Sequence, residues 1–223
     1  MPRRTAAEPA SVDPEPSETP RAPAPTARGL RARTEILTAG RAVLLETGPD
    51  RLSLREVARR AGYAPSALYN HYRDRDELVV ALAMESVGTL GRYLEAVPPG
   101  PSAPRLRALA AAYLLFAAEN PEEYRVVFDC LTNPPGDWER YAQVAHPFSI
   151  IVAACAQGLE EGVLADPDGV GASGLAFALW ALLDGSIHLR SKHLAAISGP
   201  FDAMTAAALD AFIDGGHDKE SSR

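Results

Sequence analysis

Apolar side chains recur every three or four residues along most of this 223-residue chain, which is the spacing of an amphipathic helix. No segment alternates with the two-residue period of a strand, so a β-sheet is not expected. Clusters of Pro and Gly separate the periodic stretches. The pattern predicts an all-α protein of about nine helices, at residues 30–47, 53–62, 65–72, 74–97, 105–119, 121–131, 138–161, 170–197 and 201–213.

Residues 53–78 carry the densest local signals in the chain. The spacing at 53–56 and at 74–77 is that of a capping box, which satisfies backbone N–H groups at a helix start. Gly62 can adopt the left-handed conformation that ends a helix, and Pro65 suits the first turn of the next one. A helix, a turn containing glycine and a second helix predict a helix-turn-helix, whose second helix enters the major groove of DNA.

The run from 57 to 78, VARRAGYAPSALYNHYRDRDEL, closely resembles the N-terminal DNA-binding domain of TetR-type transcriptional regulators. The resemblance extends back to about Arg31. It has one minor departure, because Arg75 stands where the family usually has Lys near the start of the third helix. It implies a sequence-specific DNA-binding regulator that responds to a small molecule, and a repressor in particular because most members of the family repress transcription. The positions that carry it are Ala58, Gly62, Leu68, Tyr69, Tyr72, Glu77 and Leu78.

The second helix of this motif presents most of the candidate DNA contacts. Tyr69 and His71 can donate hydrogen bonds to phosphate, whereas Ser66 and Asn70 could reach phosphate or a base edge. Ala67 could contact only an apolar group such as a thymine methyl. No outward residue of this helix is an arginine, so a bidentate guanine contact would come from the preceding helix or the N-terminal arm. The predicted DNA-binding set is Arg55, Ala64, Pro65, Ser66, Ala67, Tyr69, Asn70, His71 and Arg75.

Some of these side chains have an ordinary structural alternative. Tyr72 is expected in the core, whereas Tyr69 lies off the buried stripe and matches the phosphate-contacting tyrosine of the family. Arg55 and Arg75 are expected to contact the DNA backbone. The arginines at 59–60 are expected to be simply solvated.

Charge is distributed unevenly along the chain, whose net charge is −7. Residues 28–73 hold nine arginines against four acidic residues and carry +5, residues 1–27 carry −1, and residues 74–223 therefore carry −11. A basic head on an acidic body turns the head toward phosphate.

Composition and breaks divide the chain into four predicted parts. Residues 1–29 are rich in Pro, Ala, Ser and Glu and are expected to form a disordered arm. Residues 30–76 form the predicted DNA-binding domain, residues 77–214 a helical ligand-binding and dimerisation domain, and residues 215–223 a flexible tail. Whether the arm contacts DNA stays open.

Two runs in the second part resemble the C-terminal domain of one TetR subgroup: NPEEYRVVF at 120–128 and WALLDG at 180–185. That subgroup is named for a Trp, three intervening residues and His-Gly. Trp180 and Gly185 match, but Asp184 stands where the His is usual, so the role of that His cannot be transferred. The resemblance implies a ligand pocket between the helices.

Trp180, Asp184 and His188 are four residues apart and share one face of a helix. A buried Asp or His needs polar partners, so a cationic or hydrogen-bonding ligand is a hypothesis. The alternative is that each is a core residue or part of a satisfied buried pair. The candidate ligand-binding set is Phe116, Tyr124, Phe128, His146, Phe148, Trp180, Asp184 and His188.

The last two long helices carry more apolar surface than one small body easily covers. Specific binding by such a small head also favours a homodimer on a palindromic operator, with two recognition helices one DNA turn apart. A four-helix bundle across a two-fold axis, as in the family, would bury that surface. The candidate interface residues are Leu175, Leu179, Leu182, Leu183, Ile187, Phe201, Leu209 and Phe212, although spacing does not separate partner-facing from core-facing positions.

Other functional classes find little support. Cys130 and Cys155 fit no disulfide framework or metal site, no cofactor is expected, and no apolar run approaches the length of a membrane span. The N-terminus lacks a secretory pattern, so a cytoplasmic protein is expected. An enzyme using Asp184 with His188 or His146 is an unfavoured alternative, because no nucleophile or phosphate motif accompanies them. A DNA binder controlled by a partner, or acting architecturally without an inducer, is the other alternative.

Overall fold

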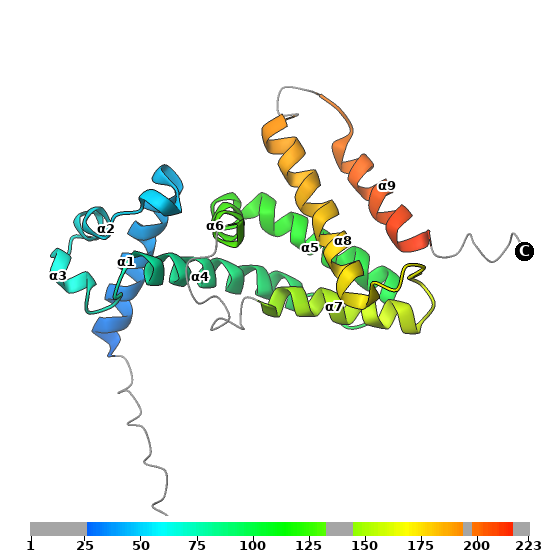
Figure 1. The fold of residues 1–223 in the computed structure, drawn as a ribbon, viewed down its shortest axis with the longest axis horizontal. Helices are drawn as coiled ribbons and strands as arrows, with labels where there is room; N and C mark the ends of the chain where they lie inside the picture. The colour runs from blue at the N-terminus through cyan, green and yellow to red at the C-terminus, as the bar shows by residue number, and fades with distance from the viewer. Residues whose placement is uncertain (1–25, 133–144, 194–197, 216–223) are drawn as a thin grey trace, which may run out of the picture.

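The computed structural model describes residues 26–132, 145–193 and 198–215. These residues form nine α-helices and no strand, which confirms the all-α fold predicted from the periodicity. Figure 1 shows three helices gathered at one end of the long helix α4 and the remaining helices arranged along and beyond its other end. Nearly all of the predicted arm and tail lies outside the described residues.

The N-terminal group consists of α1 (Ala27–Thr47), α2 (Leu54–Ala61) and α3 (Pro65–Leu68), and it lies at the first half of α4 (Arg75–Glu95). Helix α1 packs on both α2 and α4, and α2 packs on α3. A single 3-10 turn at Pro49–Arg51 joins α1 to α2. Apolar side chains at helical spacing form its core: Ile36, Leu37, Val43, Leu44, Leu52, Val57, Ala58, Leu68, Tyr72, Leu78, Val79, Leu82 and Ala83.

Three of the four predicted local signals end or start a helix as expected, those at Gly62, Pro65 and Asp74, although the capping box at 74–77 closes only in part. Gly62 ends α2 with φ 76° and ψ 23°, the left-handed conformation that L side chains resist. Asp74 caps α4, because its Oδ1 accepts a hydrogen bond from the Glu77 N–H at 2.9 Å. Glu77 reaches back to the N–H of Arg73 at 2.6 Å rather than to that of Asp74.

The capping box predicted for Ser53 and Glu56 does not form. Ser53 occupies the N-cap position of α2, but its side chain makes no capping hydrogen bond. The Glu56 carboxylate instead accepts hydrogen bonds from Arg59 and Arg60, three and four residues ahead on the same helix. The guanidinium groups are charged donors, so they outcompete the backbone N–H for this carboxylate.

The larger group contains α5 (Ser102–Glu119), α6 (Pro121–Thr132), α7 (Ala145–Glu160), α8 (Gly171–His188) and α9 (Phe201–Asp214). A π-helical turn, Leu189–His193, continues α8. Figure 1 shows α8 and α9 side by side at the end farthest from α1–α3. The buried core includes Leu90, Leu94, Leu106, Leu109, Tyr113, Phe116, Tyr124, Ile151, Leu179, Leu183, Leu209 and Ile213.

Helices α4 and α6 belong to both cores. The first half of α4 packs in the N-terminal core, whereas Leu90 and Leu94 lie in the larger one. From α6, Val126 is fully buried in the N-terminal core and Tyr124 is buried in the other. The predicted domain boundary at 76–77 coincides with the start of α4, and it stays a prediction because this helix is shared.

Several helix ends differ from the expected ones. Helix α5 begins three residues early, because Glu161 accepts hydrogen bonds from both the N–H and the hydroxyl of buried Ser102. Helix α3 is only one turn long, although its hydrogen-bonding continues to the N–H of Tyr72. Of the helix expected at 138–161, residues 138–144 lie outside the described part. The helix expected at 170–197 becomes α8 and the π turn up to His193, and residues 194–197 lie outside the described part.

One helix, Gly171–Ser191, is long and apolar enough to cross a membrane by length and composition, which the sequence pattern did not lead us to expect. It is the one such helix in the described ranges, and only 17% of its most apolar stretch is buried within the chain. Asp184 lies within it, and an ionised side chain is costly in lipid.

Candidate DNA-binding face and effector site

Helix α3 and the turn after it turn a polar face outward. Leu68 and Tyr72 are buried beneath it, as predicted, while Tyr69 is 56% exposed. Ser66 and Asn70 are also exposed, and so are Ala64 and Pro65, whereas Ala67 and His71 are half-buried. The side chains of Ser66, Tyr69, Asn70 and His71 form no hydrogen bond with any described residue, so their donors and acceptors face solvent.

The arginines of α2 divide into paired and unpaired groups. Arg60 binds both Glu46 and Glu56, and Arg59 binds Glu56. Hydrogen bonds from Arg59 and then Arg60 lower the pKa of Glu56 to about 2, so all three groups are charged at neutral pH. Arg55 is exposed on α2 and forms no ion pair within the described part of the chain.

Arg75, the other arginine predicted to contact DNA, is held by the chain itself. Its Nη1 donates to the backbone carbonyl of Asp50 at 2.8 Å, and its guanidinium pairs with Asp76. The side chain thus ties the start of α4 to the turn after α1 and remains 42% exposed. Its contact with the DNA backbone stays a prediction.

A second set of polar groups gathers around Asp184 on α8. Its Oδ1 accepts hydrogen bonds from the hydroxyls of Tyr113 at 2.6 Å and Tyr124 at 3.0 Å. The indole N–H of Trp180 donates to the Tyr113 hydroxyl at 2.9 Å. The Nδ1 of His188 lies 3.2 Å from the Tyr124 hydroxyl, which closes a network over α5, α6 and α8.

Aromatic rings surround this network, which we call the Asp184 cluster (Tyr113, Tyr124, Trp180, Asp184 and His188). The rings of Tyr113 and Tyr124 meet edge to face, with centroids 6.5 Å apart, and the Tyr124 and His188 rings are 6.0 Å apart. The Phe148 ring of α7 lies against Trp180 at 5.6 Å. Tyr113 and Tyr124 are buried, while the three α8 residues are partly exposed.

Burial sets the acidity of the cluster. It raises the pKa of Asp184 because removal from water disfavours the carboxylate, and the hydrogen bonds from Tyr113 and Tyr124 only oppose that effect. Burial, together with the nearby Asp184 charge, raises the pKa of both tyrosines, so they remain neutral donors. No Lys or Arg pairs with Asp184 among the described residues.

The structure brings together only part of the predicted ligand-binding set. Tyr124, Trp180, Asp184 and His188 meet in the cluster, and Phe148 borders it. Phe116 is fully buried against Tyr93, and the side chain of Phe128 lies outside the described residues.

His146 lies elsewhere, with its Nε2 2.6 Å from Oε1 of Glu95. These two residues border a hollow of about 260 Å³ between α4 and the start of α7. Its other lining residues are Met84, Val87, Gly88, Gly91 and Pro147.

Tyr113 is a member of the cluster that the predicted ligand-binding set did not include. It sits on the apolar face of α5, where its hydroxyl carries no periodic signal. A buried tyrosine hydroxyl needs a partner, and this requirement was the one available hint. Its partner lies 71 residues away in sequence.

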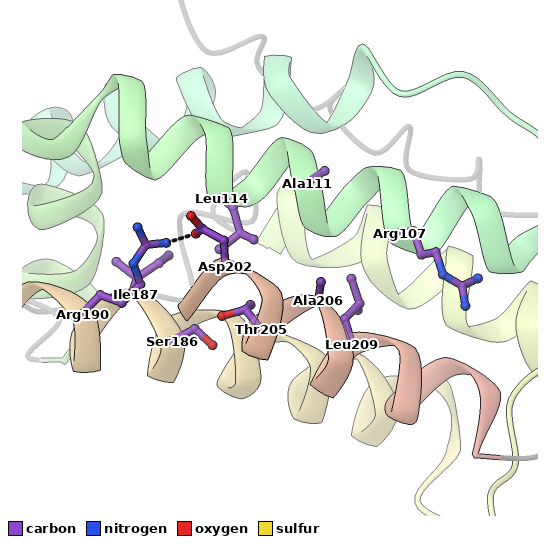
Figure 2. Close-up of a pocket in the computed structure, with 10 residues that line it drawn as sticks. All are labelled: Arg107, Ala111, Leu114, Ser186, Ile187, Arg190, Asp202, Thr205, Ala206 and Leu209. Carbon is purple, nitrogen blue, oxygen red and sulfur yellow. Dashed lines mark hydrogen bonds and ion pairs between the residues drawn. The ribbon is translucent and has the colours of Figure 1, made fainter. Parts of the chain in front are cut away.

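A further hollow of about 190 Å³ lies between α5, α8 and α9 (Figure 2). Arg190 and Asp202 pair across one end of it. Arg107, at the other end, binds Asp210 and Asp214 on α9. The two arginines are therefore occupied in holding α9 against α5 and α8. The remaining lining residues are Ala111, Leu114, Ser186, Ile187, Thr205, Ala206 and Leu209.

The predicted interface residues separate into two groups. Leu179, Leu183 and Leu209 are buried in the core of this chain and are not available to a partner. Their neighbours Leu175, Leu182, Ile187, Phe201 and Phe212 are partly exposed. The most exposed large apolar side chains on α8 and α9 are Phe177 at 65% and Met204 at 57%, which spacing did not single out.

No group of three or more potential metal ligands occurs in the described ranges. The cluster contains neutral hydrogen-bond donors, one carboxylate and one imidazole, a combination suited to holding a polar or charged small molecule.

Comparisons with known proteins agree with this geometry. Residues 36–82 match the family described as bacterial regulatory proteins, tetR family, and residues 106–214 match the tetracyclin repressor-like C-terminal domain. The Trp-His-Gly subgroup resemblance stays a prediction.

Solved structures with the same fold include a Rhodococcus sp. RHA1 protein of unknown function, 27% identical, with a TM-score of 0.68, covering 82% of this chain and 94% of that one. The TetR family transcriptional regulator PfmR from Thermus thermophilus is 19% identical, with a TM-score of 0.60 and coverage of 80% and 96%. FadR from Bacillus subtilis, in complex with stearoyl-CoA, is 14% identical, with a TM-score of 0.64 and coverage of 82% and 98%.

The raised pKa of Asp184 has a consequence for stability. The folded protein holds the carboxyl proton more tightly than the unfolded chain, so stability is lost as pH rises from the ordinary value of 3.8 through the raised pKa. We expect Asp184→Asn to raise the melting temperature at pH 7, by about 2–4 °C for each kcal/mol gained in a chain of this size. The gain should shrink toward pH 4 in thermal unfolding followed by circular dichroism.

Asp168→Asn is the matched control, because Asp168 is exposed in the turn before α8. It should leave the melting temperature unchanged across the same range of pH. A melting temperature of Asp184→Asn below that of the wild type at pH 7 would show that the carboxylate stabilises the fold.

Proposed function

Because the chain belongs to the TetR family of transcriptional regulators, we propose that it is a repressor that a small-molecule ligand releases from its operator. It acts in the cytoplasm, where it reaches chromosomal DNA. The observation that carries this proposal is the outward face of α3, where four polar side chains have no partner within the described protein. Such groups are positioned to exchange water for phosphate oxygens and base edges.

Roles on this face follow from side-chain chemistry. Tyr69 and His71 donate to phosphate, and they set the orientation of the helix on the duplex. Ser66 and Asn70 reach base edges, where an Asn amide can pair with adenine. Arg55, exposed and without an ion pair to any described residue, contributes a charged contact from α2.

Operator binding by a Tyr69 variant tests this face. Tyr69→Ala removes a predicted phosphate contact, so we expect binding to the DNA upstream of the protein's own gene to weaken by about tenfold, or about 1.4 kcal/mol. Fluorescence anisotropy at two salt concentrations measures this, and log K should fall by about 0.9 per phosphate contact for each decade of salt.

Tyr93→Phe is the control for the tyrosine variant. Tyr93 lies between α4 and α5, where its hydroxyl binds Glu119 and Asn120, and its loss should leave DNA affinity intact. If the wild type and Tyr69→Ala bound the same operator with equal affinity, α3 would not be the helix that contacts the DNA.

We propose that α8 and α9 form the homodimer interface. Phe177 and Met204 expose large apolar side chains on these two helices, which lie next to each other. A second copy related by a two-fold axis would cover this surface and the poorly buried length of Gly171–Ser191. The same axis would place two copies of α3 about 34–36 Å apart on a palindromic operator.

Phe177→Asp tests this interface. A buried carboxylate without a partner is strongly unfavourable, so we expect this variant to sediment as a monomer and to bind operator DNA at least tenfold more weakly. Leu115→Asp is the control, because it places the same charge on α5, outside the proposed interface, at a residue that is 50% exposed. This variant should remain a dimer. If Phe177→Asp remained dimeric at micromolar concentration, the interface would have to lie on other helices.

We assign the effector to the Asp184 cluster and its signal to α6. Tyr124 of α6 belongs to the cluster, and Val126, two residues later, is buried in the core beneath the DNA-binding face. The flanking residues tie α6 to α1. Glu123 accepts a hydrogen bond from Arg41 at 3.0 Å, and Arg125 donates to the carbonyl of Leu45 at 3.3 Å.

Arg41 links three helices through one guanidinium. Its Nη1 binds Glu123 of α6 and its Nη2 binds Glu85 of α4 at 2.5 Å. The Arg41 and Glu123 side chains are each only 21% exposed, so water screens this pair less than a surface pair. A shift of α6 at the cluster therefore also changes the position of α1 relative to α4.

Glu123→Gln tests the link. We expect it to weaken operator binding a few-fold, about 1 kcal/mol, because the orientation of the DNA-binding helices is less well held. Glu122→Gln is the matched control, since it removes the same charge from an exposed neighbouring position that has no ion pair in the described ranges. Identical operator affinities of the two variants would exclude Arg41–Glu123 from the pathway.

A further inference from the structure

The cluster around Asp184 is unusual in its charge balance. The carboxylate is partly buried, and it is surrounded by neutral donors and aromatic rings. Partly buried carboxylates are ordinarily paired with Lys or Arg, as Glu123 is with Arg41 in this chain. No such pair to Asp184 forms in the described ranges, where His188, one turn later on α8, acts on the carboxylate as a group that can carry a positive charge.

The carboxylate also keeps hydrogen-bonding capacity. Both tyrosine hydroxyls donate to Oδ1, and a carboxylate has about four lone-pair sites on its two oxygens. Tyr113 is itself oriented by the indole N–H of Trp180, so the donors cannot turn away to other partners without breaking the network. An incoming positive group therefore meets an acceptor that is already fixed in place.

The surrounding rings favour the same kind of ligand. Trp180, Tyr113, Tyr124 and Phe148 present aromatic faces and edges within one contiguous group. The negative face of an aromatic ring attracts an organic cation, most strongly for Trp and when water is excluded. The net charge of −11 over residues 74–223 raises the local concentration of cations further.

From these observations we propose that the effector site takes an organic ammonium cation with an apolar body, whose positive charge pairs with Asp184 and packs against Trp180 and the two tyrosines. This assignment rests on the proposed function, because it names the ligand class of the same site. The ammonium group supplies the charge that the protein omits, and the apolar body lies against the rings. Neutral and anionic molecules of the same shape lack the positive charge that pairs with Asp184.

Three probes of similar size and different charge test the assignment on the full-length protein: benzyltrimethylammonium, benzyl alcohol and benzoate. Isothermal titration calorimetry should detect binding of the cation, with at least tenfold weaker binding of the other two. Asp184→Asn keeps the acceptor oxygen for the tyrosines but removes the charge. It should therefore weaken binding of the cation by about tenfold or more. Asp168→Asn, with its exposed carboxylate, should bind like the wild type.

The outcomes separate the ligand class from the proposed regulation. Failure of the cation to bind, equal binding of the neutral probe, or unchanged cation affinity in Asp184→Asn would overturn the assignment. Operator binding is measured in parallel for each variant, which also reports correct folding. Cation binding at Asp184 without DNA release would support the ligand class and contradict the release mechanism. DNA release by a non-cationic molecule alone would support the release mechanism and contradict the ligand class.

Discussion

The packing of α6 into two cores is the constraint on which the rest of this structure depends. One turn of this helix places Tyr124 in the core of the larger helical group and Val126, fully buried, in the core beneath the DNA-binding face. Close-packed cores do not deform continuously, so a displacement of α6 must be accommodated on both sides. Helix α4 is shared as well, so two helices connect the cores at the two ends of the molecule.

In the described part of the chain, the two ends that this packing connects carry opposite unpaired charges. On the DNA-binding end, Arg59 and Arg60 are held by Glu46 and Glu56, whereas Arg55 of the same helix, α2, is exposed and has no ion pair among the described residues. At the other end, Asp184 is a carboxylate without an arginine partner in the same ranges. The chain thus presents an excess of positive charge where phosphate would lie and a negative charge where an effector would bind, with Arg41 bridging helices between them.

Much of the DNA-binding end was predictable because its signals are local. Gly62, Asp74 and the buried pair Leu68 and Tyr72 each act within a few residues, and the structure agrees with the predictions made for them. The capping box at Ser53 was wrong for an equally local reason, since Glu56 has two arginines within one turn. Competing partners for one side chain are harder to rank than the backbone preference of a glycine.

The sequence by itself determined the helical periodicity, the breaks between helices, the basic head on an acidic body and the shared face of Trp180, Asp184 and His188. All of these follow from residue type and spacing along one helix. Only the tertiary structure decided that Tyr113 reaches Asp184, that Val126 enters the other core, that Leu179 and Leu183 are internal, and that His146 pairs with Glu95 instead. The reason is physical: such contacts depend on the crossing angle and the axial position of one helix against another, and the period of a single helix encodes neither.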